Sequence, residues 1–432
     1  MPAPADIAHL LRRAGFGGTA AQIATLASQD WATTVDQLLD FSAAPPDTEP
    51  AFLTADIGDW EKEYRLQQWW LDRMATTTTP LQEKLTFFWH GHFATANYKV
   101  ADTRLMYLQN ALFRQLATGN FLGLVQQMSL QPAMLLYLDN DQNEQGQPNE
   151  NFARELMELF TLGVGNYTQA DIVASARAWT GNNTLDGDRT QYQFYPERHD
   201  GDPKTFMGVT QNWDGPDIIN FIVHDDATRE QITAKYIAKK MWSFFAYPNP
   251  DDTIVSDLAT AFIGADLSIA ELVRTIFNHA EFLSPASKQG LVRSPTEWVV
   301  TCMRAVGIDG ADANPQWFMS DMGQALFEPP NVSGWRPNDY WLTTSRVWAR
   351  ANWARYILWQ NNVQDTLIDI VGMTVSDAVQ HAFDVLNVDS PSSHTRSKLE
   401  AWMTAERAVN NGFWTYVNLL TLVMLSPEFN LA

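Results

Sequence analysis

The sequence predicts a mainly α protein, a large multi-helix single domain with long irregular loops and little or no β-structure. Along most of the 432 residues, apolar side chains recur at the spacing of amphipathic helices. Strand-like alternation is confined to one short stretch, residues 191–195. Because no internal repeat and no low-complexity linker divides the chain, we expect one helical domain over residues 1–432, within which residues 1–80 could form an N-terminal helical layer.

Glycine and proline mark the ends of the expected helices in order along the chain. The first covers residues 6–13 and ends at a glycine-rich turn, the second runs from Thr19 toward the Pro45-Pro46 break, and the third covers residues 59–74. Two stretches rich in glycine, asparagine and proline, 181–216 and 327–342, are predicted to be irregular loops. Periodicity predicts further helices at residues 80–91, 101–118, 120–127, 150–162, 168–179, 215–223, 226–246, 251–263, 267–280, 294–307, 344–360, 375–386, 395–408 and 411–425.

The composition excludes several classes of function. The 29 Lys and Arg against 50 Asp and Glu give a formal charge of −21, which argues against a nucleic-acid partner because a phosphate backbone requires a basic surface. No stretch reaches the ~18 consecutive apolar residues of a transmembrane segment. The single cysteine, Cys302, excludes an intrachain disulfide. The 17 Trp in a chain with only 18% charged residues are typical of extracytoplasmic or sugar-handling proteins, and of large helical cores alike.

Two histidines interrupt an apolar run at residues 87–93. His90 and His92 are two positions apart, which on a helix places them about 200° apart, so both could serve one site only if the helix ends at Gly91. If it ends there, the two neutral imidazoles could bind zinc or another transition metal. The alternative is that one histidine is a hydrogen-bonded core residue beside the aromatic side chains.

Residues 139–150 have the spacing of a calcium-binding loop. Counting Asp139 as position one, oxygen-bearing side chains fall at positions one, three, five, nine and twelve. The match is imperfect, because position six is Glu144 where glycine is expected. The alternative is a loop whose side chains cap the next helix. The predicted cation ligands are Asp139, Asp141, Asn143 and Glu150.

The helix predicted at residues 150–162 carries two neighbouring carboxylates. Glu155 and Glu158 are three residues apart, and Arg154 lies four residues before Glu158. Such a pair could act as general acid and base or bind a metal ion, with Arg154 orienting an anionic group. The ordinary alternative, which the pattern alone favours, is a solvated face with an Arg154–Glu158 ion pair.

The irregular stretches hold further candidates, because functional residues concentrate in such segments. His199 and Asp200 could form a ligand or base pair, and the turn at residues 329–335 could present Asn331 and Trp335 to a ligand. For Trp335, a structural place in the core is at least as well supported. Tryptophan faces are available for sugar stacking, and the predicted substrate contacts are Trp89, Trp179, Asn331 and Trp335.

Together these segments resemble a bacterial family known as the domain of unknown function eighteen-hundred. The likeness rests on residues 9–17, 88–93, 148–163, 178–181, 199–206 and 327–335, in the family's order over nearly the whole chain. The resemblance implies export, because members often carry a leader, and a partner protein that resembles a sulfatase or a phosphatase. Residues 1–16 show no secretory leader, so a cytoplasmic location stays open. The resemblance implies no catalytic residue.

Two hypotheses of function follow. The first is an extracytoplasmic, metal-dependent hydrolase that acts on carbohydrate or another polyhydroxylated or ester-bearing polymer. In it, His90, His92, His199 and one of the two glutamates bind a divalent ion such as Zn²⁺ or Mn²⁺ that activates water, while residues 139–150 hold Ca²⁺. The second is a non-catalytic helical binding or assembly protein that works with the sulfatase- or phosphatase-like partner in export or surface deposition. The glutamate helix would then be a buried polar network that fixes helix packing.

Overall fold

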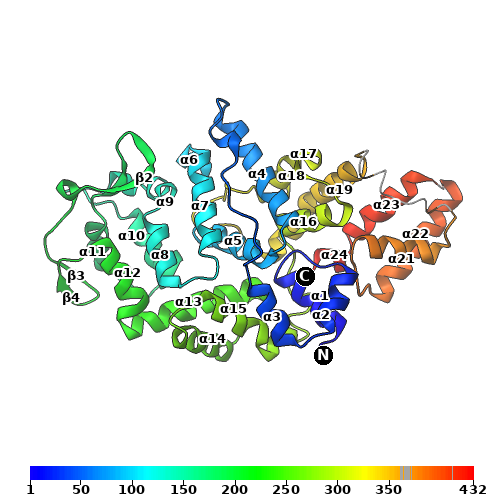
Figure 1. Ribbon diagram of the computed structural model, residues 1–432, viewed down its shortest axis with the longest axis horizontal. Coiled ribbons are helices and arrows are strands. Elements are labelled where there is room, and N and C mark those ends of the chain that lie inside the picture. Colours follow the sequence, from blue (N-terminus) through cyan, green and yellow to red (C-terminus); the bar gives the residue numbers. More distant parts are fainter. Residues whose placement is uncertain (361–362, 364–369, 371, 411) are drawn as a thin grey trace.

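The computed structural model describes residues 1–360, 363, 370, 372–410 and 412–432. Helices form nearly all of the regular structure of these residues, and the strands make two small antiparallel hairpins (Figure 1). The predicted mainly α, single-domain fold class is therefore confirmed. In the part of the chain that the structure describes, no helix has the length and apolar composition that crossing a membrane requires.

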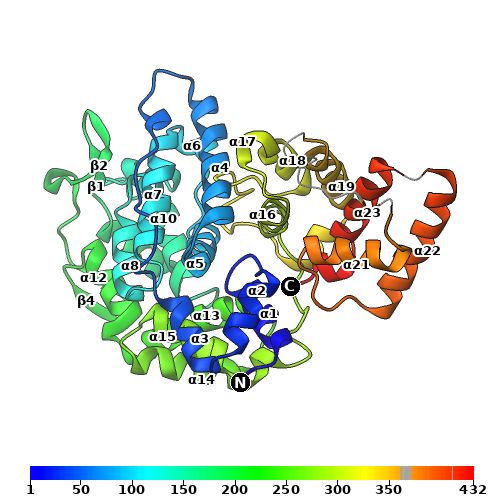
Figure 2. The same ribbon diagram turned by 45° about the vertical axis from the view of Figure 1, so that its right-hand side comes forward.

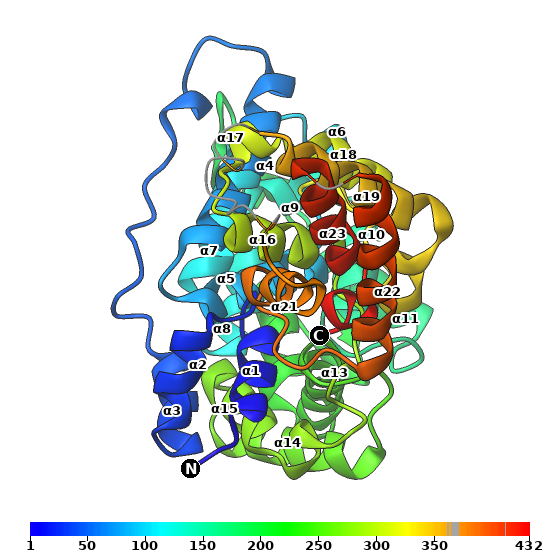
Figure 3. The same ribbon diagram turned by 90° about the vertical axis from the view of Figure 1, so that its right-hand side faces the viewer.

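Three short helices open the chain: α1 (Pro4–Arg13), α2 (Ala20–Ala27) and α3 (Trp31–Leu39). The sequence predicted one helix from Thr19 onward, but the structure has two. The second begins because the Asp30 side chain accepts a hydrogen bond from the Thr33 N–H and caps a new helix. Residues 40–58, with the short 3₁₀ turn Ala51–Leu53, then run along the outside of the molecule to α4 (Figure 3).

Four helices pack on one another at the centre: α4 (Asp59–Thr76), α5 (Pro80–His92), α7 (Thr103–Gln115) and α16 (Pro295–Val306). From Leu81 to His92, every α5 residue except Gln82 and Gly91 is buried. A helix in such a place must have its charges neutralised inside the protein. Glu83 binds Arg73 and Arg114, and Lys84 pairs with Glu297. This central helix carries His90 and His92 into the interior.

One end of the molecule is made of short helices and the two hairpins (Figure 1). Two π-helical turns, Leu156–Thr161 and Phe221–Asp225, extend α10 and α12. The strand-like stretch 191–195 belongs to β2, which pairs with β1. The elements of this end are α6 (Asn97–Val100), α8 (Phe121–Ser129), α9 (Pro132–Tyr137), α10 (Asn151–Glu155), α11 (Gln169–Ala178), α12 (Gly215–Asn220), β1 (Asn182–Leu185), β2 (Asp188–Phe194), β3 (Lys204–Phe206) and β4 (Val209–Gln211), with 3₁₀ turns at Asn140–Gln142 and Pro196–Arg198.

A layer of three helices, α13 (Ala227–Phe245), α14 (Asp252–Gly264) and α15 (Ile269–Asn278), runs along one side of the molecule beside α3 (Figure 2). The later helices form the opposite end from the hairpins. They are α17 (Gly310–Ala313), α18 (Pro315–Met322), α19 (Thr344–Leu358), α21 (Val375–Val385), α22 (Ser393–Val409), α23 (Phe413–Met424) and α24 (Pro427–Asn430), with 3₁₀ turns at Ala280–Leu283 and Asn338–Leu342.

Most of the buried apolar side chains form one contiguous core that extends from Leu10 to Phe429, and Ile7, Ala8, Leu11 and Ile23 form a small second cluster. Segments far apart in the sequence close the core. The His9 ring hydrogen-bonds the Phe282 carbonyl at 3.1 Å, and the Arg13 guanidinium donates to the Ser287 carbonyl at 2.6 Å. The backbone N–H of Arg293 donates to the Asn430 carbonyl at 2.8 Å. Residues 282–293 therefore join the beginning of the chain to α24. A separate N-terminal layer over residues 1–80 stays a prediction.

Candidate functional site

A cavity of about 600 Å³ opens between α5, α13 and the irregular segment at residues 333–341. Its walls are mainly aromatic. Phe87 and Phe88 come from α5, Phe244 comes from α13, and Trp335 and Trp341 come from the irregular segment. A concave, largely apolar cavity with a few polar groups is the usual form of a small-molecule site. This cavity is therefore the candidate functional site.

Lys240 is the cavity's most unusual polar residue. Its ammonium group lies 5.3 Å from the centre of the Tyr236 ring, one turn earlier on α13. Burial alone lowers the pKa of Lys240 to about 8, and among the described residues no carboxylate forms an ion pair with it. A lysine in such surroundings can bind an anionic group, or supply a neutral amine at mildly alkaline pH.

His92 lies beside Lys240 at the cavity wall. Its Nε2–H donates to the Phe160 carbonyl at 3.1 Å, in the π-helical turn after α10. Its Nδ1 is buried and has no hydrogen-bond partner among the described residues. Burial, together with the charge of Lys240, lowers the pKa of His92 well below its usual value, so the ring is neutral. The predicted site residue His92 thus does reach the cavity.

His90 does not share a site with His92. The α5 helix does not end at Gly91 but continues to His92, so the two rings leave the helix on different sides. The His90 Nε2 accepts a hydrogen bond from the Phe327 N–H at 3.1 Å, and burial lowers the His90 pKa to about 3. Its ring packs on Trp70 and Trp335. The structural alternative, a hydrogen-bonded core histidine, describes His90.

Trp335 reaches the cavity because its loop lies directly on α5. A side chain at Gly334 would place its Cβ 2.5 Å from the Gly91 carbonyl oxygen, and Gly334 has a φ of +74°, so this close approach requires glycine. The Asn331 side chain caps the same loop by accepting from the Ser333 N–H at 2.9 Å and points into solvent. Of the predicted substrate contacts, Trp335 lines the cavity and Asn331 does not.

Trp89 and Trp179 are core residues in this structure, and both are 0% exposed. The Trp89 indole donates to the Ala117 carbonyl at 3.3 Å, while Trp179 packs edge-on against Phe152. Neither ring offers a free face to a sugar. Their placement corrects the predicted substrate contact, because helices this closely packed place their largest side chains in the core.

Glu155 and Glu158, the predicted acid–base pair, are electrostatic neighbours. Burial and the charge of Glu158 raise the pKa of Glu155. The Glu158 carboxylate accepts a hydrogen bond from the Tyr167 hydroxyl at 2.5 Å. Arg154 pairs with Glu150 at 3.0 Å rather than with Glu158. Glutamate four residues before a basic residue is the more favourable order on a helix. The two glutamates do not line the aromatic cavity.

Glu63 on α4 and Glu328 at the start of the loop 327–335 form a second pair of neighbouring carboxyls. Burial and the charge of Glu63 raise the pKa of Glu328 to about 7. Burial, a hydrogen bond to Tyr98 and the charges of Glu328 and Glu155 raise the pKa of Tyr137. Glu155 and Glu328 therefore both act on Tyr137.

The residues of the predicted calcium loop bind other protein groups. Asp139 pairs with Lys99 at 2.8 Å and accepts from the Asn151 amide. The Asn143 amide is buried and bonds the Ala176 carbonyl and the Asn149 N–H. Glu150 binds Arg154 and Gln169. Burial and the charge of Asp139 raise the pKa of Asp141. The loop-and-cap alternative accounts for these contacts.

His199 and Asp200 hold the hairpin region to α11. The His199 Nδ1 hydrogen-bonds the Thr180 carbonyl at 2.9 Å, and Asp200 forms a two-point ion pair with Arg177. That hydrogen-bonded pair lowers the pKa of Asp200. The buried Lys204 ammonium donates to the Asp200 carbonyl at 2.5 Å. Among the residues that the structure describes, no three His, Cys, Asp or Glu side chains are arranged to hold a metal ion.

Sequence reasoning missed Lys240, Tyr236 and Glu328 as site residues. On α13, two adjacent lysines in an amphipathic pattern are typical of a solvated face, so no signal marked Lys239 and Lys240, which both line the cavity. Glu328 lay within the 327–335 segment that the sequence did single out. Its coupling to Glu63, 265 positions earlier, depends on the packing of the loop against α4.

The fold and cavity define a mainly helical protein with an aromatic pocket beside its central helix. The sequence profile of the family described as "Protein of unknown function (DUF1800)" matches residues 9–431, nearly the whole chain, so the protein belongs to that family. No curated protein and no solved structure is detectably similar to it.

Proposed function

We propose that the aromatic cavity is the ligand site of this protein, and that its ligand combines a flat apolar face with an anionic group, as an acidic sugar unit of a polymer does. The observation that carries the proposal is Lys240, a cation in an aromatic cavity. No carboxylate among the described residues forms an ion pair with this lysine. An anionic group on the ligand would supply that partner. Hydrogen bonds between charged groups are about twice as strong as those between neutral groups.

The other cavity residues support the same kind of ligand. Trp335 and Phe88 offer aromatic surface on which a sugar ring can stack. Gln324, Ser294 and Asn338 lie among the lining residues and can exchange hydrogen bonds with hydroxyl groups. The one carboxylate of the described lining, Glu297, is paired with the buried Lys84. In a chain of net charge −21, this local excess of positive charge selects for an acidic ligand.

Calorimetric titration with trigalacturonate, and with maltotriose as the neutral control, tests the proposal. We expect trigalacturonate to bind more tightly, and Lys240→Gln to reduce its affinity at least tenfold by removing the charge. The matched control is Lys235→Gln on the exposed face of the same helix, which should bind like the parent protein. Equal affinity of Lys240→Gln and the parent, or no heat with the acidic sugar, contradicts the proposal.

Hydrolysis with the help of a divalent ion is a separate proposal, which rests on the sequence motifs alone, because no three His, Cys, Asp or Glu side chains of the described residues are arranged to hold a metal ion. We expect purified protein to carry a divalent metal, and its melting temperature to rise on addition of Ca²⁺, Mn²⁺ or Zn²⁺. Elemental analysis and a thermal melt check this. Less than ~0.2 equivalents of metal with no thermal shift contradicts it, because binding to the folded state must stabilise that state.

A second candidate function, the assembly protein, is supported by exposed tryptophans on α4 and α18. Trp60 is 71% exposed and Trp317 is 65% exposed. Trp317 packs against Tyr64, one turn after Trp60 on α4, so the three rings lie near one another. Exposed aromatic groups of this kind are enriched at protein interfaces. Trp60→Ser with Trp317→Ser should weaken co-purification of a sulfatase- or phosphatase-like partner while leaving the melting temperature unchanged.

A further inference from the structure

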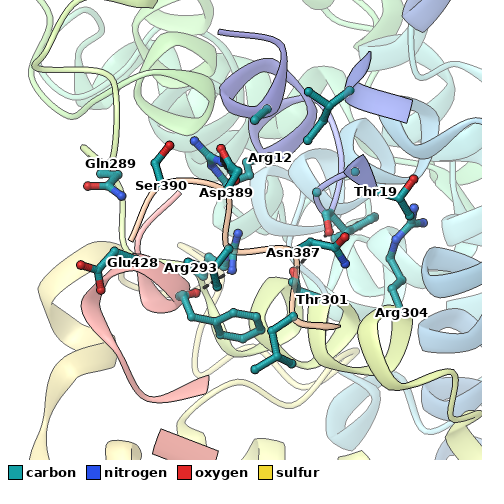
Figure 4. A pocket seen from close by; sticks show the side chains of 18 of the residues that line it. Arg12, Thr19, Gln289, Arg293, Thr301, Arg304, Asn387, Asp389, Ser390 and Glu428 are labelled. Carbon is teal, nitrogen blue, oxygen red and sulfur yellow. Dashed lines mark hydrogen bonds and ion pairs between the residues drawn. The ribbon is translucent and has the colours of Figure 1, made fainter. Parts of the chain in front are cut away.

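A second cavity, of about 180 Å³, lies where the glycine-rich turn after α1 meets the segments at 289–293 and 386–390 (Figure 4). Three arginines line it from different elements. Arg12 belongs to α1, Arg304 belongs to α16, and Arg293 lies just before α16. The cavity shares no lining residue with the aromatic cavity. It is large enough for a tetrahedral oxyanion with bound water and too small for a polymer chain.

The arginines of this cavity are only partly satisfied by the protein. Arg12 pairs with Asp389 at 3.0 Å, but its Nε is buried without a hydrogen-bond partner among the described residues. Arg293, which is 6% exposed, donates to the Phe429 carbonyl at 2.6 Å. Arg304 donates to the Ala75 carbonyl at 3.2 Å. Within the described residues, neither Arg293 nor Arg304 forms an ion pair with a carboxylate.

The carboxylates of the cavity do not balance these charges. Asp389 is already paired with Arg12. Glu428 accepts hydrogen bonds from the Ser392 N–H and the Thr395 hydroxyl and lies across the cavity from Arg304 (Figure 4). Glu297 and Asp389 both act on Arg293, but these two carboxylates face four cations, Arg12, Arg13, Lys84 and Arg293. Buried cations in excess of their counter-charges are costly, so a protein that keeps them has a use for an anion there.

We propose that this cavity binds a phosphate- or sulfate-type tetrahedral oxyanion, held by Arg293 and Arg304 with Arg12 at its edge. Guanidinium groups present several N–H donors in a fixed plane, which matches the oxygens of such an anion. The Thr19 hydroxyl, which caps α2, and the Asn387 amide lie beside the arginines and can donate further hydrogen bonds (Figure 4). The anion either is free or belongs to a small phosphorylated molecule; the recognising chemistry is the same.

Thermal melts with phosphate test the site. Sodium phosphate should raise the melting temperature of the parent protein in a saturable manner beyond NaCl of equal ionic strength. Arg304→Gln should require at least tenfold more phosphate for the same rise. Arg355→Gln, which removes an exposed charge on α19, should behave like the parent. The variant comparison separates binding from the general stabilisation that phosphate gives by exclusion from protein surfaces, which rises without saturation.

A second measurement does not depend on a variant that folds. Phenylglyoxal modifies accessible arginines, and peptide mass spectrometry follows each one separately. Phosphate should slow modification of Arg304 at least fivefold and leave Arg355 unaffected. Glycerol 3-phosphate run in parallel identifies the source: saturation at a lower concentration than inorganic phosphate indicates a phosphorylated ligand, and the reverse indicates a free anion. Equal modification rates with and without either compound, or identical melts of Arg304→Gln and the parent, overturn the proposal.

Discussion

At the scale of single residues, Lys240 and Glu328 have pKa values of about 8 and about 7, near enough to neutrality for each to change charge under mild conditions. Burial is the first cause in both, and it disfavours the charged form of each group. For the lysine this lowers the pKa, and for the glutamate it raises the pKa. Both groups therefore change charge between about pH 7 and about pH 8, whereas an ordinary glutamate does so in acid and an ordinary lysine in alkali.

Lys240 should react as a neutral amine at a lower pH than an ordinary lysine. Because its pKa is about 8, acetylation by acetic anhydride should reach half of its maximal rate near pH 8. Lys235, exposed on the same helix, is the internal reference and should lag behind it. Peptide mass spectrometry over pH 6–11 measures both rates. Coincident profiles would show that the cavity does not alter the lysine.

Glu328→Gln should stabilise the protein at alkaline pH. The folded-state pKa of Glu328 lies above its ordinary value of 4.5, so the stability that this carboxyl contributes is present below about pH 4.5 and lost as the pH rises through about 7. Glutamine cannot ionise and keeps an acceptor. We expect a higher melting temperature than the parent at pH 8.5 and little difference at pH 5. Glu197→Gln, an exposed change, controls for net charge, and a variant less stable at pH 8.5 would refute the prediction.

Sequence patterns identified some site residues and could not identify others. His92 was singled out because a histidine interrupts an apolar run, and Trp335 because it lies in an irregular stretch rich in proline and glycine. Lys240 was not, because only the packing of α13 against its neighbours decides whether a lysine of this helix is half-buried at a cavity or fully solvated. Trp89 and Trp179 were assigned a ligand role that burial in the core does not support.

At the scale of elements, helix positions follow from periodicity, since most predicted ranges agree with the structure to within a few residues. The differences have local causes. Asp30 starts a new helix where one was expected, and α5 continues through Gly91 because packing on all sides outweighs the low helix propensity of glycine. The π-helical turn after α10 was not predictable from apolar spacing, yet it is the segment that meets His92.

Glu83→Gln should destabilise the central helix strongly. Glu83 is 0% exposed and binds Arg73 at 2.6 Å and Arg114 at 2.7 Å, so its neutralisation leaves these two arginines with the more exposed Asp47 as their remaining ion-pair partner among the described residues. Loss of one partner from a buried ion pair costs about 3–5 kcal/mol, whereas an exposed pair contributes below about 1 kcal/mol. Urea unfolding measures the stability cost of losing the buried pair and the cost of losing an exposed pair.

Glu61→Gln on α4, which loses an exposed pair with Arg65, is the matched control for this change. The Arg73 and Arg114 charges lower the pKa of Glu83, so the stabilisation is present above pH 4.5 and is lost as the pH falls below it. The two variants should therefore converge in acid. Equal costs of Glu83→Gln and Glu61→Gln at pH 7 would contradict the prediction.

At the scale of the whole molecule, the length and apolar content were enough to predict one large helical core, because a chain of this size can bury one. The pairing of distant segments was not predictable. The spacing of apolar residues predicts neither the contact of α1 with residues 282–287 nor the backbone hydrogen bond between Arg293 and Asn430. Both cavities form between such segments, so their positions depended on the structure.

Salt should stabilise the protein as a whole. A net charge of −21 makes the folded state repel itself, and added ions screen that repulsion. We expect the melting temperature to rise by a few degrees between 10 and 200 mM NaCl at pH 7.5, and differential scanning calorimetry measures it. A fall over this range would mean that internal ion pairs such as that of Glu83 outweigh surface repulsion.

The contact of the first helix with residues 282–287 has a consequence for synthesis in the cell. At the usual elongation rate of about 5–20 residues per second, the ribosome needs on the order of tens of seconds to make the chain between Arg13 and Ser287. During that time Ile7 and Leu11 can pack only on the neighbouring α2 and α3, and the contacts of α1 with residues 282–287 are missing. The newborn amino-terminal segment is therefore a natural binding site for chaperones until about two-thirds of the chain has been made.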